Sequence, residues 1–537
     1  MKSLFTLLFT ALLGTADAQT VQWMKQGGLS GEGRGVSSDA LDNAYVCGTV
    51  GNPALFDEDT TASHFADAFI AKYDDAGTIQ WVRTGGGSLI DQANDIVTDA
   101  GGNSYVTGFF NTNFPNPTVD FAGNVITGLG SEDLFLAKYD ANGALLWIRY
   151  GGGTQAEEGR GVELAADGNV VVSGFFQGTA VFGNDTLVSA GLSDILLLKY
   201  DPQGNLLWSM RAGGAGDDQA NKLTACPNGD VAVVGAFQGS FVLGGNTIVS
   251  SGLYNVFLSR IAANGTALWS ASAGSTNASV ADQAFDITCA ANGDLVFCGE
   301  IAGTALFDGL SVVPNGGRDI VIARYDGSGA VQWVHHAGGP QTDHAYGVAV
   351  DADGNSYLTG QADSGANTVF DSITLAPFGN EAVFLAKYDP AGGVQWVERY
   401  APGQGRAIAL LGSGCLYFTG GASGIVGEPA FDTIPWQYVD RAIFTALFCE
   451  DIGTQVDAIV KEVPLGHVYP DPANEYLSIP AFAPGTTITI TDLRGNVVYA
   501  HAAVGTIRVT EWPEGYYILR THGPDGATQC SSFIVIH

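Results

Sequence analysis

Short stretches in which apolar and polar residues alternate follow one another along most of the chain, separated by turns rich in Gly, Asp and Asn. In FLAKYDANGALLW, from Phe135 to Trp147, one alternating strand enters a turn containing Gly143 and a second apolar strand leaves it. Alternation with a period of two is typical of half-buried β-strands, and two such strands joined by a tight polar turn form a hairpin. The pattern therefore predicts an all-β protein built from consecutive hairpins.

Two modules of fifteen residues alternate along the chain, and each has the pattern of a hairpin. The first occurs seven times, as in YGVAVDADGNSYLTG from Tyr346, and every copy ends in glycine: Gly48, Gly108, Gly174, Gly235, Gly299, Gly360 and Gly420. The second is complete six times and ends in tryptophan: Trp81, Trp147, Trp208, Trp269, Trp333 and Trp396. One copy of each predicts a four-stranded antiparallel sheet, in a unit of about 60 residues. We interpret the tryptophans as packing anchors between sheets.

The ends of the repeat region predict how the sheets are arranged. Val21-Gln22-Trp23 matches only the fourth strand of a unit, whereas the last copy, from Arg406 to Phe448, supplies three strands and stops without its Trp. Pairing the first strand with the last sheet would close a ring and remove two exposed edges. A unit of about 60 residues is also too short for an immunoglobulin-like domain and fits a propeller blade. We therefore expect a seven-bladed β-propeller over residues 19–452, with four-stranded blades, closed by the N-terminal strand.

The first eighteen residues have the organisation of a signal peptide. Lys2 precedes an apolar run from Leu4 to Leu13, and Ala16-Asp17-Ala18 forms a small-x-small cleavage site before Gln19. No later stretch approaches the roughly 20 apolar residues that a membrane-spanning helix needs. We expect residues 1–18 to be removed and the protein to be exported without a membrane span.

Charge and cysteine content indicate which partners are disfavoured and whether disulfides are expected. The formal net charge is −33, which disfavours nucleic acids and anionic membrane surfaces because these recruit basic proteins. The seven cysteines are scattered without CxxC spacing, so we expect no disulfide framework. Cys47 and Cys298 occupy a repeat position that is elsewhere small, as in Thr107 and Ser173, and we interpret them as core residues.

The composition changes after the last repeat. Residues 453–465 lack the repeat and predict a linker, and residues 466–537 contain further alternating segments. These include VYPDPANEYLSI from Val468, ITITDLRGNVVY from Ile488, EGYYIL from Glu514 and FIVIH from Phe533. Six or seven short strands in so few residues predict a small β-sandwich that follows the propeller.

Both parts of the chain resemble known families. The pattern FLAKYDxxGxxxW followed by a copy of xGVAVDADGNSYLTG resembles the bacterial β-propeller repeats known as SBBP repeats. The blocks within residues 466–537 resemble the type A C-terminal sorting domain of the type IX secretion system of Bacteroidota. The first resemblance implies a propeller on a secreted or cell-surface protein and no catalytic residues. The second implies that the type IX machinery and a sorting protease act on residues 466–537, and that the protein is extracellular or on the outer cell surface.

One set of acidic residues recurs just before the first strand of five units. Its members are Asp91, Glu157, Asp218, Asp282 and Asp343. Carboxylates gathered around a central pore could hold Ca²⁺, which takes six to eight oxygen ligands. The alternative is that each acid accepts hydrogen bonds from backbone amides at its own strand entry, as short polar side chains often do. We favour the alternative, and no other cofactor is indicated.

The sequence contains no GxSxG elbow, HExxH pair or phosphate-binding loop, so no enzyme is indicated. We call the loop face the end of the propeller shared by the connections between blades and those between second and third strands. Its sevenfold sameness is broken by the long segment from Phe109 to Glu132 and by an insertion from Ser275 to Ser279. We expect a scaffold for binding or adhesion that takes a surface glycan or protein on this face. A secreted hydrolase acting on glycans and a structural surface-layer component are the alternatives.

Overall fold

The computed structural model describes most of residues 19–450 and several strands of the C-terminal part. In the first range, 29, 52–53, 57–58, 62–65, 113–116, 244, 278, 364, 366, 377–380, 423–428, 432–433 and 436–441 lie outside the described residues. Toward the C-terminus the description covers 476–478, 487–492, 497–502, 506–510, 512–513, 515–522 and 528–535. The predicted signal peptide and linker therefore lie outside it. The chain divides into two compact units, Met1–Asp451 and Ile452–His537, which we describe separately.

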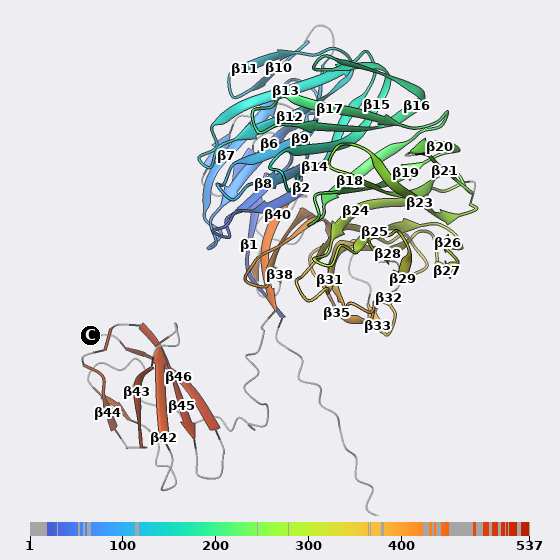
Figure 1. The fold of residues 1–537 in the computed structure, drawn as a ribbon. Helices are drawn as coiled ribbons and strands as arrows, with labels where there is room; N and C mark the ends of the chain where they lie inside the picture. Colours follow the sequence, from blue (N-terminus) through green and yellow to red (C-terminus); the bar gives the residue numbers. More distant parts are fainter. Residues whose placement is uncertain are drawn as a thin grey trace, which may run out of the picture. The chain divides into compact units, whose positions relative to one another are not determined.

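The first unit is a β-propeller, as the repeat pattern predicts (Figure 1). Its described strands pair in seven four-stranded antiparallel sheets, in each of which we call the strands a to d from the inside outward. Blades 1 to 4 are β2 (Gly31–Ser38), β3 (Ala44–Gly51), β6 (Ala66–Tyr73) and β7 (Ile79–Gly86); β8 (Gln92–Thr98), β9 (Ser104–Asn111), β12 (Glu132–Tyr139) and β13 (Leu145–Gly153); β14 (Glu157–Leu164), β15 (Val170–Phe182), β16 (Asp185–Tyr200) and β17 (Leu206–Ala212); and β18 (Gln219–Ala225), β19 (Val231–Phe237), β22 (Asn255–Ile261) and β23 (Ala267–Ser275). Blades 5 to 7 are β24 (Gln283–Cys289), β25 (Leu295–Ile301), β28 (Asp319–Tyr325) and β29 (Val331–Gly338); β30 (His344–Val350), β31 (Ser356–Asp363), β34 (Glu381–Tyr388) and β35 (Val394–Arg399); and β36 (Gly403–Leu410), β37 (Cys415–Ala422), β40 (Ala442–Glu450) and β1 (Gln19–Gly27).

The N-terminal strand closes the ring in the way the sequence predicts. β1 pairs antiparallel with β40, so that Val21 lies opposite Phe448 and Trp23 opposite Leu447. The strands a of successive blades adjoin one another all the way round, from β2 through β8, β14, β18, β24 and β30 to β36 and back to β2. These seven strands form the wall of a central channel.

An additional hairpin covers the outer edge of most blades. The chain between strands b and c of one blade reaches back and pairs with strand d of the blade before it, as β10 (Thr118–Phe121) and β11 (Asn124–Thr127) do with β7. Equivalent hairpins are β4 (Ala54–Phe56) with β5 (Asp59–Thr61), β26 (Ala305–Phe307) with β27 (Leu310–Val312), and β32 (Thr368–Phe370) with β33 (Ile373–Leu375). In blade 3 the hairpin continues β15 and β16, whereas β20 (Ser240–Leu243) with β21 (Asn246–Val249) and β38 (Pro429–Phe431) with β39 (Ile434–Pro435) form sheets of their own.

These hairpins account for part of the variation on the loop face. The segment from Phe109 to Glu132 contains a β-hairpin, in which Phe121 is buried and lies opposite Gly85 of β7. Pairing there occupies backbone groups of strand d that would otherwise form an exposed edge. Much of the length of this segment therefore belongs to an edge-protecting hairpin shared by most blades, and ligand binding by this loop stays a prediction.

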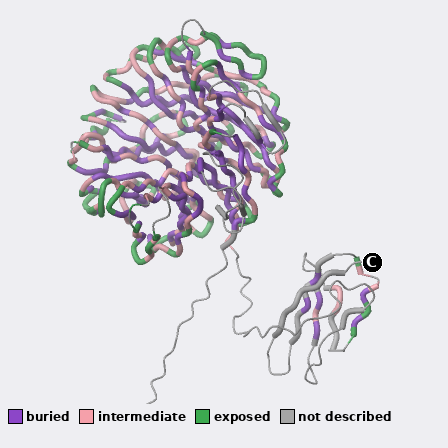
Figure 2. Tube along the Cα trace, turned by 180° about the vertical axis from the view of Figure 1, so that it is seen from behind, coloured by how far each residue is buried: buried purple, intermediate pink, exposed green. Residues whose placement is uncertain are grey.

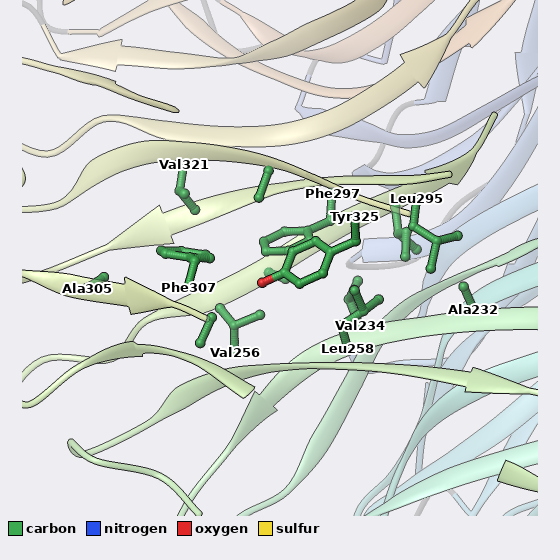
Figure 3. Packing of buried hydrophobic residues seen from close by; sticks show 14 of the residues in the cluster. Ala232, Val234, Val256, Leu258, Leu295, Phe297, Ala305, Phe307, Val321 and Tyr325 are labelled. Atoms are coloured by element: carbon green, nitrogen blue, oxygen red, sulfur yellow. The ribbon is translucent and has the colours of Figure 1, made fainter. Parts of the chain in front are cut away.

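The hydrophobic core lies between neighbouring blades. Figure 2 shows buried residues along the strands and exposed residues mainly at the turns of the propeller. One cluster joins Val234, Val256 and Leu258 of blade 4 to Phe297 and Tyr325 of blade 5 (Figure 3). Every residue of β25 is buried because its sheet is covered on both faces by neighbouring blades. Alternation of apolar and polar residues alone does not predict this.

Six of the seven repeated tryptophans donate a hydrogen bond to the following blade, which confirms their interpretation as anchors, whereas the Trp208 nitrogen has no partner among the described residues. The indole of Trp81 donates to the carbonyl of Ala141 at 3.1 Å, in the turn between strands c and d of the following blade. Trp147, Trp269 and Trp333 donate to equivalent carbonyls, and Trp23 donates to Asp75 at 2.9 Å. Blade 7 has no such turn because β1 comes from the other end of the chain. Its Glu450 supplies the acceptor instead, and its Oε1 lies 2.7 Å from the Trp396 nitrogen.

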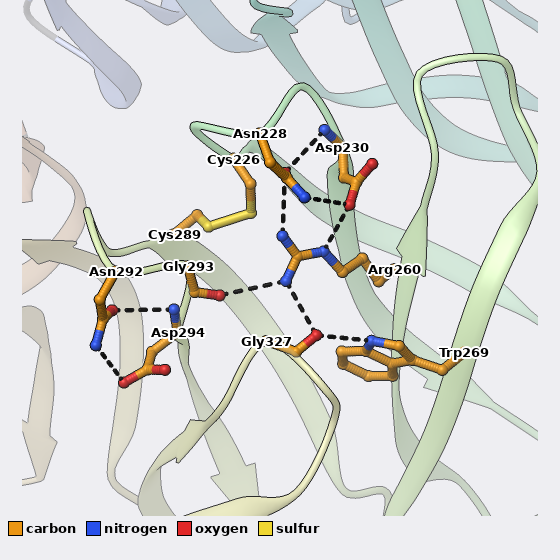
Figure 4. The surroundings of a disulfide bond; sticks show 10 residues. All are labelled: Cys226, Asn228, Asp230, Arg260, Trp269, Cys289, Asn292, Gly293, Asp294 and Gly327. Atoms are coloured by element: carbon orange, nitrogen blue, oxygen red, sulfur yellow. Dashed lines mark hydrogen bonds and ion pairs between the residues drawn. A yellow bond between two sulfur atoms is a disulfide. The ribbon is translucent and has the colours of Figure 1, made fainter.

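Two disulfides contradict the expectation that cysteines form no bridges. Cys226 and Cys289 join blades 4 and 5, and Cys415 joins Cys449 across adjacent strands of blade 7. Figure 4 shows the first bridge beside Arg260, which donates to Asp230, Gly293 and Gly327 and so ties the same two blades. The partners lie 63 and 34 residues apart, so each pair meets only through the blade packing or the strand pairing. Cys47 and Cys298 are free and buried, as predicted for core residues.

The second unit contains two small sheets. β41 (Tyr476–Ser478) pairs with β44 (Thr506–Arg508), while β43 (Val497–Ala502), β42 (Thr487–Asp492), β45 (Gly515–His522) and β46 (Thr528–Val535) follow one another in the second sheet. Residues of both sheets share one buried cluster, which contains Ile490, Ile507 and Leu519. This is the small β-sandwich that the alternating segments predict.

Candidate functional site

The channel opens into a cavity of about 360 Å³, here called the mouth cavity. Its lining includes one side chain from the same repeat position of every blade: Arg34, Asn94, Arg160, Asn221, Phe285, Tyr346 and Arg406. Each lies in the first half of a strand a, which begins at the connection between blades, so the mouth cavity opens on the loop face. We would expect a position with only a structural role in the ring to carry the same type of residue in all seven blades. Instead, three arginines, two asparagines and two aromatic residues give different sides of the cavity different chemistry.

Guanidinium groups cover the side of the cavity formed by blades 7, 1 and 3. Glu32 bridges two of them, with its carboxylate 3.1 Å from Arg34 Nη2 and 2.9 Å from Arg406 Nε. Arg160 pairs with Glu158 at 3.0 Å and donates to Asn221 at 2.7 Å. Burial, together with the nearby Arg406, lowers the pKa of Arg34, although Glu32 opposes this shift. These contacts hold the guanidinium planes in fixed orientations at the cavity wall.

Aromatic rings cover the opposite side, on blades 5 and 6. The ring centroids of Phe285 and Tyr346 lie 5.1 Å apart, and His344 stacks on Tyr346 with centroids 5.2 Å apart. The Arg406 guanidinium lies over the Tyr346 ring at 4.1 Å and so joins the aromatic side to the charged side. His344 Nδ1 lies against the carboxylate of the buried Glu300, which fixes the imidazole from behind. The rings therefore form a rigid apolar surface beside a polar one.

A cluster of three charged side chains forms the floor of the mouth cavity. Lys222 of blade 4 reaches across the channel to Asp95 of blade 2, with Nζ 2.5 Å from Oδ1, and Asp286 of blade 5 lies beside them. The equivalent positions of the other blades are small, namely Gly35, Gly161, Gly347 and Ala407. Asp95 Oδ2 also accepts from the amide of Val162 in blade 3, and Asp286 Oδ2 from that of Val348 in blade 6, each at 2.8 Å. Each carboxylate thus fastens its blade to the next one.

A second cavity of about 270 Å³ lies beyond this floor and is lined by later residues of the same strands, including Glu163 and Thr224. Burial raises the pKa of Glu163 to about 7 and that of Asp286 to about 6, although Lys222 opposes both shifts. Burial alone would lower the pKa of Lys222, but Asp95 and Asp286 outweigh it and raise that pKa. The charge cluster therefore separates the two cavities and, through these contacts, ties five blades together at the middle of the channel.

Replacing Lys222 by Met should destabilise the propeller by about 3 kcal/mol, because it leaves Asp95 and Asp286 without their shared cation. Removing one partner of a buried ion pair costs about 3–5 kcal/mol of folding free energy. We expect the lower end of this range, because the Lys222 side chain is 21% exposed to the channel. Chemical denaturation of the full chain measures the loss. A Lys222→Met, Asp95→Asn, Asp286→Asn protein should recover most of it, and equal stability of the wild type and the single variant would contradict the assignment.

The five acids considered for a calcium ring are not brought together. Each is buried at its own blade connection and accepts from backbone amides: Asp91 from Gly87 and Asn111, Glu157 from Gly153, Asp218 from Gly214 and Gln238, Asp282 from Ser275 and Ala302, and Asp343 from Gly339 and Asp363. The distances run from 2.6 to 3.2 Å. Across the described residues, no three acidic, histidine or cysteine side chains gather as a metal site would require. The arrangement is that of backbone caps, and the ring has no geometric support.

The other feature singled out on the loop face also has a local role. In the insertion from Ser275 to Ser279, the Ser275 hydroxyl donates to Asp282 at 2.8 Å and the Asn277 amide donates to the Ala302 carbonyl at 3.1 Å. Sequence reasoning missed the mouth residues, although their signal is present. They occupy the first position of the fifteen-residue module, the place where the copies differ most in chemical type.

Comparison with known proteins finds a family match in each part of the chain. Residues 467–536 match the secretion system C-terminal sorting domain, and residues 332–365 match the SBBP β-propeller repeat. The sorting domain is that of the type IX system, so the protein is exported to the cell surface or the extracellular space and interacts with that secretion machinery. No helix in the described part of the chain has the length and apolar character to cross a membrane.

Individual relatives are distant. An uncharacterized WD repeat-containing protein of Acanthamoeba polyphaga mimivirus is 23% identical over 60% of this chain and 29% of its own length. A protein named regulatory protein FlaEY, of Caulobacter vibrioides, is 30% identical over 41% of this chain and 24% of its own length. The chain thus spans under a third of the length of the curated relatives it matches. Among solved structures, the Dos1 propeller is 11% identical, covering 80% of this chain and 95% of that one, with a TM-score of 0.40.

Proposed function

We propose that this secreted propeller is a binding protein for adhesion at the cell surface, and that its ligand occupies the mouth cavity. The observation that carries the proposal is the break in sevenfold symmetry at one inward-facing position. Blades 5 and 6 place aromatic rings there, while blades 7, 1 and 3 place guanidinium groups. Binding sites combine apolar surface with fixed polar groups, and this mostly polar cavity holds an aromatic pair among polar side chains that ion pairs and hydrogen bonds fix in place.

A glycan is the ligand class that this lining favours. Phe285 and Tyr346 supply apolar ring atoms to the lining, and the amides of Asn94 and Asn221 lie among the polar groups around them. The four cationic side chains of the lining are paired with acids, namely Glu32, Glu158 and Asp95, so the lining gives no preference for a charged saccharide over a neutral one.

The cavity argues against the two alternative functions. A glycan hydrolase needs two carboxyl groups held on either side of the scissile bond. Here Glu32 and Glu158 are both engaged in ion pairs with arginines, and Asp286 accepts from two backbone amides. A purely structural surface-layer component would need no polarised cavity at the channel mouth. We therefore place binding ahead of catalysis and of a structural role.

Replacing Phe285 and Tyr346 together by Ala should weaken glycan binding by tenfold or more, which corresponds to about 1.4 kcal/mol. The measurement is a screen of glycans and matrix proteins against the full chain, followed by titration of the hits. A Gln332→Ala, Gln395→Ala protein is the matched control, because both residues are exposed beside turns between strands c and d. Equal affinities of the two variants would rule out the mouth cavity, and shortening of the glycan would indicate a hydrolase.

A further inference from the structure

Two acidic side chains lie side by side and fully buried where the chain passes from β13 to β14. A Cβ placed on Gly152 would lie 2.2 Å from Asp133 Oδ1 and 2.6 Å from Glu157 Oε2, so both oxygens approach the same glycine. Both residues are 0% exposed. Only glycine fits at position 152, and no side chain therefore separates the two carboxyl groups.

The same arrangement recurs between β29 and β30. A Cβ on Gly338 would lie 2.6 Å from Asp319 Oδ1, while Asp343 Oδ2 accepts from the next amide, that of Gly339, at 2.8 Å. Asp319 is 0% exposed and Asp343 is 1% exposed. The pairs Asp133 with Glu157 and Asp319 with Asp343 are thus equivalent pieces of the repeat, three blades apart.

Buried oxygens without a donor among the described residues occur in both pairs, and in the first pair they include Glu157 Oε1. Asp133 Oδ2 accepts from the Leu129 amide at 2.8 Å, and Asp319 Oδ2 accepts from the Asn315 amide at 2.7 Å. The other oxygen of each, Oδ1, is buried and has no hydrogen-bond partner among the described residues. A buried charged oxygen without a donor is costly, and two adjacent carboxylates cannot both ionise cheaply.

Blade 4 shows what the repeat puts at the same point. Asn255 replaces the aspartate, and its Oδ1 accepts from the Ser251 and Gly252 amides at 2.8 and 3.0 Å, as Asp133 Oδ2 does from its own loop. A Cβ on Gly274 would lie 2.0 Å from Asn255 Nδ2 and 2.8 Å from Asp282 Oδ2. A donor nitrogen therefore occupies the place of the unpartnered Asp133 oxygen. Its contacts at 3.4 Å are the carbonyls of Ala273 and Ser275, so this place is surrounded by acceptors.

Among the described residues, the charged groups that act on these acids are other acids. Asp133 and Glu132 act on Glu157, Asp343 acts on Asp319, and Asp363 acts on Asp343. Burial raises the pKa of Glu157 to about 7 and that of Asp319 to about 6, and the neighbouring acid adds to both shifts. The related pair in blade 3 differs, because Arg211 lies 3.1 Å from Asp194.

We propose that each pair, Asp133 with Glu157 and Asp319 with Asp343, holds one shared proton in the folded protein at mildly acidic pH. The ligand of each site is a proton. It occupies the place that an amide hydrogen of Asn255 Nδ2 takes in blade 4, where that nitrogen faces backbone carbonyls. The protonated Oδ1 becomes a donor among acceptors, and the adjacent Glu157 or Asp343 keeps its backbone amide bonds as an anion. Two of the formal negative charges are thereby absent from the folded protein.

The sites make stability depend on pH in a definite direction. Their acids bind protons more tightly when folded than when unfolded, so their contribution is fully present below the unfolded pKa. It is lost as the pH rises through the folded pKa, which for Glu157 is about 7. Between pH 5 and pH 8 the wild-type melting temperature should fall, and the fall should be smaller for an Asp133→Asn, Asp319→Asn protein.

The test compares melting of the full chain at the two pH values, in a chelator and in Ca²⁺. Asp353→Asn, in an exposed turn, is the control and should melt with the wild-type pH dependence. Asn255→Asp should enlarge the fall, because it places a further acid beside Asp282, and it keeps the proposal testable if the double variant does not fold. Infrared spectra at pH 5 should show a neutral carboxyl band that weakens in the double variant. An unchanged fall with no such band would overturn the proposal, as would Ca²⁺ raising the melting temperature of the wild type alone.

Discussion

A protein lacking residues 21–26 should melt at a markedly lower temperature than the full chain, because these residues form strand d of blade 7. Their removal deletes the pairing of β1 with β40 and exposes the edge of β40. It also removes Trp23, which packs on Tyr73 and Tyr417 and reaches Asp75 of blade 1. Loss of a large core aromatic costs about 3–5 kcal/mol, so the total should exceed about 3 kcal/mol. Differential scanning calorimetry measures the shift.

Two substitutions separate the contribution of the side chain from that of the strand. Trp23→Ala should reproduce part of the loss, since it keeps the ladder with β40 but empties the contact with blade 1. Gln22→Ala changes an exposed neighbour on the same strand and should leave the melting temperature close to that of the full chain. A truncated protein that melts with the full chain would show that the ring does not depend on β1.

Deleting residues 467–537 should abolish delivery to the cell surface and leave a folded propeller inside the cell envelope. The sorting domain occupies this range, and the propeller unit ends before it with cores of its own. Fractionation with an antibody against the propeller measures delivery. Appearance of the truncated protein on the surface in normal amounts would contradict the role of the domain.

Mass spectrometry of the exported wild-type protein tests removal of the domain separately. We expect peptides that contain Trp512 to be missing from protein at the surface and present in protein still within the cell. Their recovery from the surface at full stoichiometry would show that the domain is retained. A passenger protein fused to residues 453–537 is the positive control for delivery, because it carries the domain without the propeller.

The architecture of the propeller was predictable because the same sequence pattern recurs along the chain. The copies share the alternation, the turn glycine and the Trp, so a departure from the pattern in one copy does not obscure the repeat. The match of Val21-Gln22-Trp23 to strand d alone was enough to predict closure. The contacts of Trp81 and Trp147 then follow from the same repeat, since an anchor used in one blade is used in the next.

The features that the sequence did not reveal depend on contacts between blades. Cys226 and Cys289 stand at different positions of the module, and only the packing of blade 4 on blade 5 brings them together. The mouth cavity arises because seven inward positions converge, although each of them reads locally as an ordinary strand residue. The acid pairs join the start of strand c to the start of the following strand a, two places that the sequence separates by 24 residues at Asp133 and Glu157.

The bridge between Cys415 and Cys449 determines how the propeller bears a mechanical load. The chain leaves the propeller at Glu450, one residue after Cys449, and that glutamate also accepts from Lys387 and Trp396 of blade 6. Tension applied to the following segment therefore passes through a covalent bond into β37, in the middle of the blade. Such a pull cannot peel β40 from its neighbours one hydrogen bond at a time. The closing blade is thereby protected from unzipping when the segment after Glu450 is pulled.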